Sequence, residues 1–429
     1  MKKDSLKFEI SVIIVKYYHR IKFTIHWGDR VNIGLFTDTY IPQVNGVVTV
    51  VRNLKENLSA NGNNVYVFTV NHPDAEPMKN VIRVPSVKFI KEPQHRIGTP
   101  FSAHVMKIVK EKKLDIIHTH TEFSMLFQAA MVSRRYKIPM VHTLHTMYDE
   151  YIHYIPFLEY FSANAFKMLF KIICKNSEAL IAPSQKAKDF LLRYGAYKPV
   201  KVIPNGINLE RFYEAKKEEH EDIKRFRYRF NIEDNDKVLI FVGRLGKEKG
   251  IDTLLYILNK LVKVDKKIKL LLVGDGPEKE NLKDLSKELD IMENTIFAGY
   301  LQWPDEVRTA YNASDLALIA SSTESFGLVV LEAMACGLPV VAIKDPSFLN
   351  LIYDNENGFL CENAEEMAER TKKLILKPEK YGEMKQKARK TAEKFSVQQN
   401  AARTFSLYKE ILNLDTSFGF NRSKDTADN

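Results

Sequence analysis

The chain has 429 residues, which is longer than one compact core accommodates and indicates two domains of ordinary size. Hydrophobic residues make up 45% of the chain and charged residues 28%, which excludes a disordered protein, and no apolar run reaches the ~20 residues that span a bilayer. The net charge of +10 lies in the front half, where residues 31–205 contain 22 Lys and Arg against 13 Asp and Glu. No zinc-finger spacing or aromatic RNA-binding motif accompanies this charge, so we expect no nucleic-acid partner, and an anionic membrane stays open.

Residues 1–30 precede any regular pattern. They contain 7 Lys and Arg against 3 Asp and Glu, and basic residues separate the apolar runs Ile10–Ile14 and Ile21–Trp27. The segment lacks a small-residue cleavage site, which argues against a signal peptide. It is either a basic amphipathic membrane anchor or a misassigned translation start, and we favour the second.

From Val31 onward, short β-rich runs alternate with helical stretches such as Val47–Asn61, a pattern typical of a doubly wound parallel sheet. The pattern breaks at Pro204-Asn205-Gly206, so we predict a first domain over residues 31–206. Its predicted strands are Asn32–Thr37, Asn64–Val70, Ile116–His120, Met140–His145, Ala179–Ala182 and Lys201–Pro204.

A second alternating series follows a charged segment and predicts a second domain over residues 207–395. Residues 396–413 are predicted as a terminal helix and residues 414–429 as a disordered tail. The fold class is therefore α/β, with two doubly wound Rossmann-like domains facing across a cleft, where the carboxyl ends of their strands bind ligands. The predicted strands of the second domain are Val238–Gly243, Ile268–Gly274, Thr295–Ala298, Leu316–Ala320 and Val340–Ile343.

The segment Ser321–Lys344 carries two glutamates, Glu324 and Glu332, around the start of an apolar helical run. Ser325 is the predicted N-cap of this helix, which would leave the amides of Phe326, Gly327 and Leu328 as donors for an anion. Two carboxylates at different depths suit a ligand with hydroxyls at one end, a diphosphate in the middle and a ribose at the other.

Competing site patterns are weaker. The loop Gly243–Gly250 lacks the Gly-Lys-Ser/Thr of a P-loop, and Gly274-Asp275-Gly276-Pro277 has Lys279 in place of the third glycine of a dinucleotide fingerprint. Four histidines near two strand ends make a zinc site worth considering. Carboxylate or thiolate partners at ligand spacing are missing, so we expect no metal. The three cysteines have no CxxC spacing, which favours a reducing cytoplasm. The histidines are His118, His120, His142 and His145.

From Val31 to about Leu412 the sequence resembles the retaining GT-B glycosyltransferases of the family 4 type, whose signature is the paired glutamate followed by the turn at Gly337-Leu338-Pro339. The resemblance implies that Glu324 holds sugar hydroxyls and Glu332 the ribose. It also implies that the terminal helix crosses back to the first domain.

The loop after Val242 supplies the cations for the chemistry that the resemblance implies. Departure of a nucleoside diphosphate builds negative charge on phosphate, and fixed cations must neutralise it when no metal does. Arg244 offers a planar fork and Lys249 a point charge, and both match the diphosphate-binding positions of the family.

Two residues of the first domain complete the predicted site. His145 matches the family histidine that holds the 6-hydroxyl of the donor sugar, which makes it a catalytic candidate with Arg244, Lys249 and Glu324. Gly46, at the first helix start, would let the backbone approach substrate closely. His118 and His142 are interpreted as hydrogen-bonded core histidines.

The stretches His118–Ser124 and His142–Tyr154 are similar to those of bacterial diacylglycerol glucosyltransferases. This similarity implies transfer of glucose from UDP-glucose to diacylglycerol, with the nucleotide sugar as co-substrate and no further cofactor. Two alternatives stay open: a phosphatidylinositol or polysaccharide acceptor, and a nucleotide-sugar epimerase on the same fold.

A lipid acceptor requires contact with a membrane, and the helical stretch Met106–Leu114 combines apolar and basic positions. We predict a cytoplasmic enzyme that is peripheral on the inner face of the cell membrane. A solvated helix with an ordinary core stripe explains the same stretch equally well. The predicted membrane-binding residues are Lys107, Lys110, Lys112 and Lys113.

Overall fold

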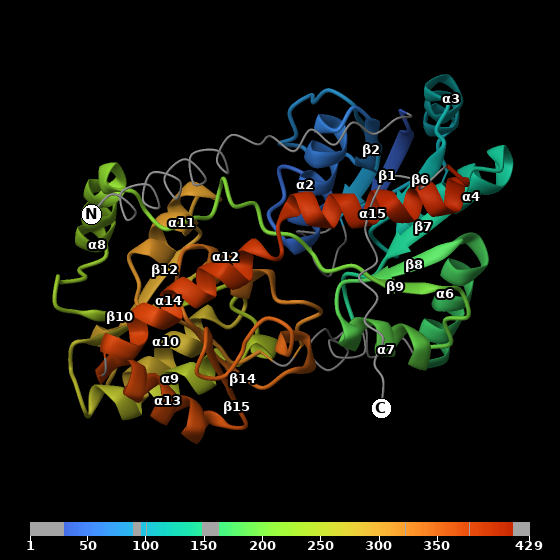
Figure 1. The fold of residues 1–429 in the computed structure, drawn as a ribbon. Coiled ribbons are helices and arrows are strands. Elements are labelled where there is room, and N and C mark those ends of the chain that lie inside the picture. Colours follow the sequence, from blue (N-terminus) through green and yellow to red (C-terminus); the bar gives the residue numbers. More distant parts are fainter. Residues whose placement is uncertain are drawn as a thin grey trace, which may run out of the picture.

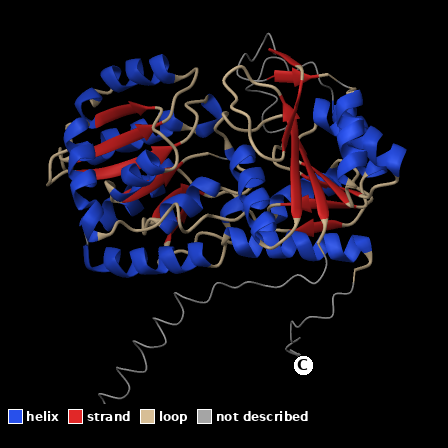
Figure 2. Cartoon of the chain, turned by 90° about the horizontal axis from the view of Figure 1, so that it is seen from above, coloured by secondary structure: helices blue, strands red, loops and turns tan. Residues whose placement is uncertain are grey.

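The computed structural model describes residues 30–88, 96–99, 101–147, 163–321, 323–376 and 378–414. Two parallel sheets, each flanked by helices, lie side by side, one in each half of the chain (Figures 1 and 2). The predictions for residues 1–29 and for the tail from residue 415 lie outside the described residues.

The first sheet has the order β3-β2-β1-β6-β7-β8-β9, with all neighbours parallel. The chain starts in the middle of the sheet, winds to one edge and returns to build the other, as a doubly wound fold does. Its strands are β1 (Asn32–Thr37), β2 (Asn64–Val70), β3 (Val81–Val84), β6 (Ile116–Thr119), β7 (Met140–Thr143), β8 (Ala179–Ala182) and β9 (Val200–Val202).

Helices cover this sheet, and a short antiparallel hairpin of β4 (Ser86–Lys88) and β5 (Arg96–Gly98) lies beside it. The helices are α2 (Gly46–Ala60), α3 (Ala103–Lys112), α4 (Ser124–Tyr136), α6 (Ala163–Asn176) and α7 (Gln185–Arg193).

The second sheet has the order β12-β11-β10-β13-β14-β15, again all parallel, so the two domains repeat one winding rule. Its strands are β10 (Lys237–Val242), β11 (Ile268–Val273), β12 (Thr295–Gly299), β13 (Leu316–Ile319), β14 (Val340–Ile343) and β15 (Gly358–Cys361). Its helices are α8 (His220–Arg229), α9 (Ile251–Val262), α10 (Lys279–Glu288), α11 (Asp305–Asn312), α12 (Leu328–Ala335), α13 (Ala364–Leu376) and α14 (Pro378–Glu393), with the 3-10 turns η3 (Lys217–Glu219), η4 (Lys247–Lys249), η5 (Met292–Asn294) and η6 (Pro346–Phe348).

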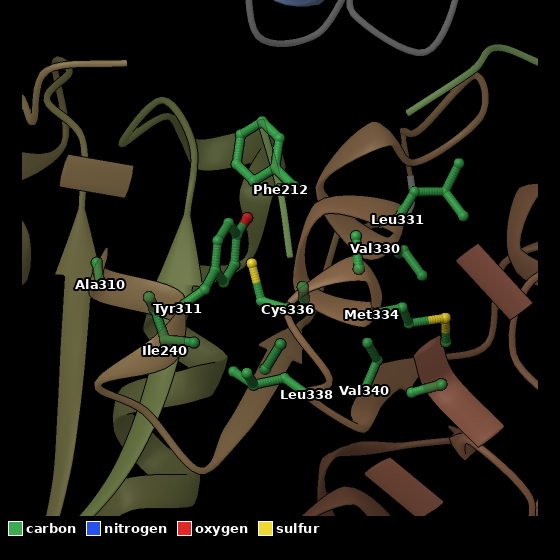
Figure 3. Close-up of a cluster of buried hydrophobic side chains, with 14 of the residues drawn as sticks. Phe212, Ile240, Ala310, Tyr311, Val330, Leu331, Met334, Cys336, Leu338 and Val340 are labelled. Atoms are coloured by element: carbon green, nitrogen blue, oxygen red, sulfur yellow. The ribbon is translucent and has the colours of Figure 1, made fainter. Parts of the chain in front are cut away.

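The central strands are apolar at consecutive positions because helices cover both faces of a parallel sheet. In β10, Leu239 and Phe241 enter the core on one face while Ile240 enters the core on the other. Figure 3 shows the second of these cores, where Ile240 packs among side chains that include Tyr311 and Cys336. This packing fixes the strand ends from which the site loops leave.

The predicted fold class is confirmed, and every predicted strand is present within about two residues of its expected bounds. The strands β3 and β15 were not predicted, nor were β4 and β5 of the hairpin. β3 and β15 are edge strands whose apolar pattern is interrupted, by Arg83 in β3 and by Gly358 at the start of β15.

The terminal helix α15 (Val397–Leu412) follows the second domain in sequence but packs on the first (Figure 1). Phe405 and Tyr408 are buried in the core that contains Leu54 of α2. The Tyr408 hydroxyl lies 2.6 Å from Nδ1 of His118, so the terminal helix is hydrogen-bonded to a buried side chain of the first sheet.

The chain crosses between the domains twice, and the crossings run side by side. Ile207 and Ser396 form an isolated parallel bridge, and Asn400 donates to the carbonyl of Pro204 at 2.7 Å. A Cβ on Gly206 would lie 2.6 Å from Cα of Val397, so only glycine permits this approach. The boundary predicted at residue 206 coincides with this double crossing, while the domain limits themselves stay a prediction.

Candidate functional site

Each sheet reverses its strand order at one point, between β1 and β6 and between β10 and β13. Loops that leave the carboxyl ends of strands at such a reversal are the usual ligand-binding loops of doubly wound domains. In the second domain these loops hold Arg244 and Lys249 after β10 and Glu324 after β13. The sequence-predicted cations and the first glutamate are therefore brought together.

Lys249 and Glu324 form an ion pair across the reversal point, with Nζ 2.6 Å from Oε1 and both side chains largely buried. Burial opposes ionisation of Glu324, but the Lys249 ammonium and the hydrogen bonds from Lys249 and Ser321 outweigh it and lower the pKa of the carboxyl. Glu324 is therefore a charged acceptor at neutral pH, suited to hydroxyl donors.

Arg244 is held by a carboxylate that the sequence did not single out. Its Nη2 lies 3.1 Å from Oε1 of Glu248, whose side chain is buried while that of Arg244 is 40% exposed. A Cβ on Gly246 would collide with the Glu248 carboxylate, so the glycine makes room for it. The guanidinium thus keeps a fixed orientation with part of its donor set open to solvent.

The helix that carries Glu332 starts later than predicted, so the expectation for Ser325 as N-cap is wrong. α12 begins at Leu328, and Gly327 precedes it with φ 92° and without a side-chain cap. Glycine is required there twice, for its positive φ and because a Cβ would lie 2.7 Å from the Phe348 ring. The Ser325 carbonyl instead accepts a bond from the Ser184 hydroxyl at 2.7 Å.

Glu332 lies one turn into α12 and is almost completely buried. Burial raises its pKa to about 7, although hydrogen bonds from Tyr311 and Trp303 act in the opposite direction. The Tyr311 hydroxyl donates to Oε2 at 3.3 Å. The two glutamates therefore differ in charge state near neutral pH, which the sequence spacing did not indicate.

Of the predicted backbone donors, Phe326 is buried and Gly327 and Leu328 form the start of α12. A Cβ on Gly46 would touch Cδ1 of Leu328 at 3.7 Å. The start of the first-domain helix α2 therefore lies against the start of α12. Both helix starts meet where the backbone amides were predicted to bind an anion. Asn45 caps α2 through its side chain, which accepts from the amide of Val48.

A second interdomain contact brings α7 against the glutamate loop. Nζ of Lys186 lies 2.8 Å from the carboxylate of Asp345 and 3.4 Å from the carbonyl of Glu324. In this pair Asp345 is buried and Lys186 is largely buried. The first domain thus supports the backbone of the loop that carries Glu324.

The predicted histidines gather at the carboxyl ends of β6 and β7. Nε2 of His145 lies 3.1 Å from Nδ1 of His120, with the rings stacked. Burial, reinforced by the charge of His142, lowers the pKa of His145 to about 3, so its ring is neutral. His118 bonds Tyr408 and Thr143, in agreement with its interpretation as a core histidine.

His142 is also a core residue, with Nδ1 2.8 Å from the Thr119 hydroxyl and Nε2 3.3 Å from Glu122. Within the described ranges no group of three or more His, Cys, Asp and Glu side chains is placed to hold a metal ion.

Asp38 is a functional candidate that the sequence analysis did not single out. It follows β1 and is buried, and it accepts from the Thr121 hydroxyl at 2.6 Å, the Ser124 hydroxyl and the Met125 amide at 3.1 Å. Burial raises its pKa against these hydrogen bonds. The carboxyl ties β1 to the start of α4 at the reversal point of the first sheet.

The predicted membrane helix α3 uses its apolar positions in the domain core. Val105 and Val109 are buried there, and Met106 and Ile108 pack against the same cluster. Nζ of Lys112 lies over the Tyr66 ring. No helix of the part that the structure describes is long and apolar enough to cross a membrane.

Comparison with known proteins places this geometry in a family. Residues 44–211 match the family described as Glycosyltransferase Family 4, and residues 222–391 match Glycosyl transferases group 1. The α-monoglucosyldiacylglycerol synthase of Streptococcus pneumoniae is 36% identical over 338 residues, 78% of this chain and 76% of the relative. The enzyme of the same name from Acholeplasma laidlawii is 32% identical, over 89% of this chain and 97% of the relative.

Solved structures show the same fold. Anabaena HepE in complex with UDP superimposes with a TM-score of 0.71 at 21% identity, covering 89% of this chain and 100% of HepE. Sucrose-phosphate synthase from Thermosynechococcus elongatus has the same TM-score at 22% identity, covering 90% of this chain and 100% of the synthase.

Proposed function

This chain belongs to the GT-B glycosyltransferases of the family 4 type and is a hexosyltransferase, and from that premise we propose that it transfers glucose from UDP-glucose to diacylglycerol. The product is monoglucosyldiacylglycerol, formed by an enzyme that is cytoplasmic and peripheral on the inner face of the cell membrane. The names of the two relatives with more than 30% identity support this acceptor class.

One observation carries the proposal: two cations and a charged carboxylate meet at the reversal point of the second sheet. Arg244 and Lys249 lie in the loop after β10, and Glu324 lies in the loop after β13. Nζ of Lys249 lies 2.6 Å from Oε1 of Glu324. A sugar diphosphate needs both halves of this set, because its phosphates require cations and its hydroxyls require acceptors.

In the proposed reaction, the bond between the anomeric carbon and the β-phosphate oxygen breaks as the acceptor hydroxyl attacks from the same face. Arg244 and Lys249 neutralise the charge that builds on the leaving diphosphate. Glu324 holds sugar hydroxyls and Glu332 the ribose. The leaving phosphate accepts the proton of the attacking hydroxyl, so no side chain is required as a nucleophile and the configuration is retained.

His145 completes the proposed donor site from the first domain. In its neutral ring each nitrogen either donates or accepts a hydrogen bond, depending on the tautomer, and the 6-hydroxyl of a hexose can pair with either kind. The contact with Nδ1 of His120 occupies Nε2 and leaves Nδ1 for the ligand.

The proposal is tested with the purified full-length protein and a matrix of nucleotide sugars and lipids, with products read by mass spectrometry. UDP-glucose, UDP-galactose, GDP-mannose and UDP-N-acetylglucosamine are each combined with diacylglycerol, phosphatidylinositol and a polysaccharide. Glucosyldiacylglycerol from UDP-glucose is the expected dominant product. A dominant product on another acceptor, or interconversion of the free nucleotide sugars, would contradict the proposal.

A further inference from the structure

The helix α4 (labelled at the right of Figure 1) has two apolar faces, of which only one lies in the core. Met125, Leu126 and Ala129 are buried in the first-domain core. On the opposite face, the exposed residues of the first two turns are Phe127 and Met131, and Phe123 precedes them at the N-cap. Positions four residues apart share one helix face, so these three form a single stripe.

Further exposed apolar residues lie on the segments next to α4. Phe101, Phe123 and Phe127 are 55%, 52% and 45% exposed, and they are the exposed phenylalanines of the described residues. The β4–β5 hairpin beside α4 adds Val87 and Ile97, which face each other across the hairpin and are exposed. The hairpin joins α4 through the Gly98 amide, which donates to the Ser124 hydroxyl at 3.0 Å. An exposed apolar patch of this kind marks an interaction surface.

Charge on the same helix indicates the partner. The exposed residues of the last turn of α4 are Arg134 and Arg135, and Lys137 follows as the C-cap. Arg134 donates to the neutral Asn176 side chain at 2.7 Å, so that hydrogen bond does not cancel its charge. An apolar stripe that ends in cations matches an anionic lipid surface, where apolar side chains enter the hydrocarbon and cations meet the headgroups.

The position of the stripe relates it to the proposed site. α4 begins at the carboxyl end of β6, where the Ser124 hydroxyl and the Met125 amide bond the Asp38 carboxylate. Phe123 is therefore adjacent in sequence to residues that line the reversal point of the first sheet. A membrane that takes up the stripe would therefore lie next to this reversal point, within reach of a lipid hydroxyl at its surface.

We propose that Phe101, Phe123, Phe127 and Met131 insert into the hydrocarbon of an anionic membrane leaflet, with the cations at the end of α4 on the headgroups. The lipid acceptor then reaches the reaction centre while its acyl chains stay in the leaflet. This inference rests on the proposed function for the identity of the acceptor, but the membrane contact itself is independent of the sugar. It differs from attachment through the lysines of α3, a helix whose Val105 and Val109 are buried in the domain core.

Vesicle flotation of the full chain tests the surface. The variant Phe123→Ser/Phe127→Ser/Met131→Ser should lower partitioning into vesicles that contain anionic phospholipid by about 100-fold, because apolar contact area is lost. Wild-type binding should persist in about 1 M NaCl, where attraction between exposed charges is screened. The matched control is Tyr256→Ser/Val264→Ser/Met292→Ser, three exposed apolar positions on the second domain, in which Met292 has the exposure of Met131, 39% against 38%.

Insertion is measured directly with Phe127→Trp and vesicles whose acyl chains are brominated. Quenching of the new tryptophan, and its absence for Tyr256→Trp, supports the proposal. Wild-type flotation by the triple serine variant overturns it. Unchanged flotation with a lowered unfolding temperature also overturns it, since this chain would then cover the stripe itself. Lost flotation for a variant with Gln at Lys107, Lys110, Lys112 and Lys113, with the stripe variant unaffected, assigns attachment to α3 instead.

The surface and the proposed function fail separately. If the wild type makes glucosyldiacylglycerol while the stripe variant binds vesicles normally, the surface is wrong and the function stands. The opposite outcome is that the stripe variant loses vesicle binding and keeps its UDP affinity while the wild type forms no lipid product with any donor. In that case the proposed function is wrong and the proposed membrane surface stands.

Discussion

The two domains repeat one winding rule but place opposite chemistry at their reversal points. At the end of β10 and β13, cations and a charged carboxylate face one another, with Lys249 and Glu324 in an ion pair. At the ends of β1, β6 and β7, Asp38 and His120 are buried and His145 is partly buried, and all three side chains are hydrogen-bonded within the first domain. The fold therefore sets where a ligand binds, and the residues at the strand ends set which part of it each domain takes.

This difference fits a reaction between a diphosphate donor and a lipid hydroxyl. The charged end suits the phosphates of the donor, and the first-domain end, with His145 for the donor sugar and the apolar stripe of α4 beyond it, suits the sugar and the acceptor. Substitutions at the charged end should have the largest effects on activity.

Removal of either cation should be the most damaging change. We expect Arg244→Ala and Lys249→Ala each to lower kcat by roughly 100-fold or more, because their pairing with phosphate strengthens as the diphosphate leaves. Steady-state kinetics measures the effect, and Lys247→Ala, an exposed lysine in the same loop, is the control. Normal kcat with only a raised KM would remove both residues from the chemical step.

The two glutamates should separate in binding experiments. Glu324→Gln should lower the affinity for UDP-glucose by roughly 10- to 100-fold, since it removes a charged acceptor for sugar hydroxyls. The affinity for UDP should stay nearly unchanged. Glu332→Gln should weaken UDP itself. Isothermal calorimetry with both ligands checks the assignment, which is wrong if the two variants behave alike.

UDP binding should depend on pH through Glu332, whose pKa burial raises to about 7. Below that pH the carboxyl is protonated and a weaker acceptor for the ribose hydroxyls, so affinity should fall as pH decreases. One proton linked to binding gives about a tenfold loss between pH 8 and 6. Glu332→Gln should abolish this dependence, and a wild-type affinity that is constant over this range would reject the role.

A buried histidine of the first domain should affect how the free energy of unfolding depends on pH. Burial holds the pKa of His118 well below its usual range, so the folded protein resists protonation that the unfolded chain accepts. Stability from this neutral ring is present above about pH 6.5 and is lost as pH falls, by up to about 1.4 kcal/mol per pH unit. Urea unfolding of His118→Gln between pH 7.5 and 5.5 should have a shallower pH slope than that of the wild type. The exposed His104→Gln should keep the wild-type slope.

Much of this architecture was predictable from the sequence, because buried parallel strands are apolar at consecutive positions. Strand β1 has the predicted bounds, and helix α15 (Val397–Leu412) lies within one residue of the predicted 396–413 at each end. The start of α12 was mispredicted because serine is a common N-cap residue, which made Ser325 the apparent helix start. The helix instead follows Gly327, which has a positive φ and packs closely against the Phe348 ring.

Glu248 and Asp38 could not be assigned roles for a related reason. A single acidic residue in a loop has no spacing that distinguishes it from a solvated charge. Burial of Glu248 under Gly246, and convergence of Thr121 and Ser124 on Asp38, result from contacts that only the folded chain provides. By contrast, the glycines and cations around Arg244 lie close together in sequence and were recognisable.

The return of α15 to the first domain has a consequence for synthesis on the ribosome. The first domain emerges early, but Phe405 and Tyr408 of its core are made near the end of the chain. Until they arrive, the apolar face of α2 around Leu54 stays uncovered and His118 lacks the Tyr408 hydroxyl. The second domain, whose strands end at Cys361, can complete its sheet before the first domain completes its core. The domain that is translated first is therefore the domain that matures last, and a nascent chain that stalls before Phe405 exposes an unfinished core to chaperones and proteases.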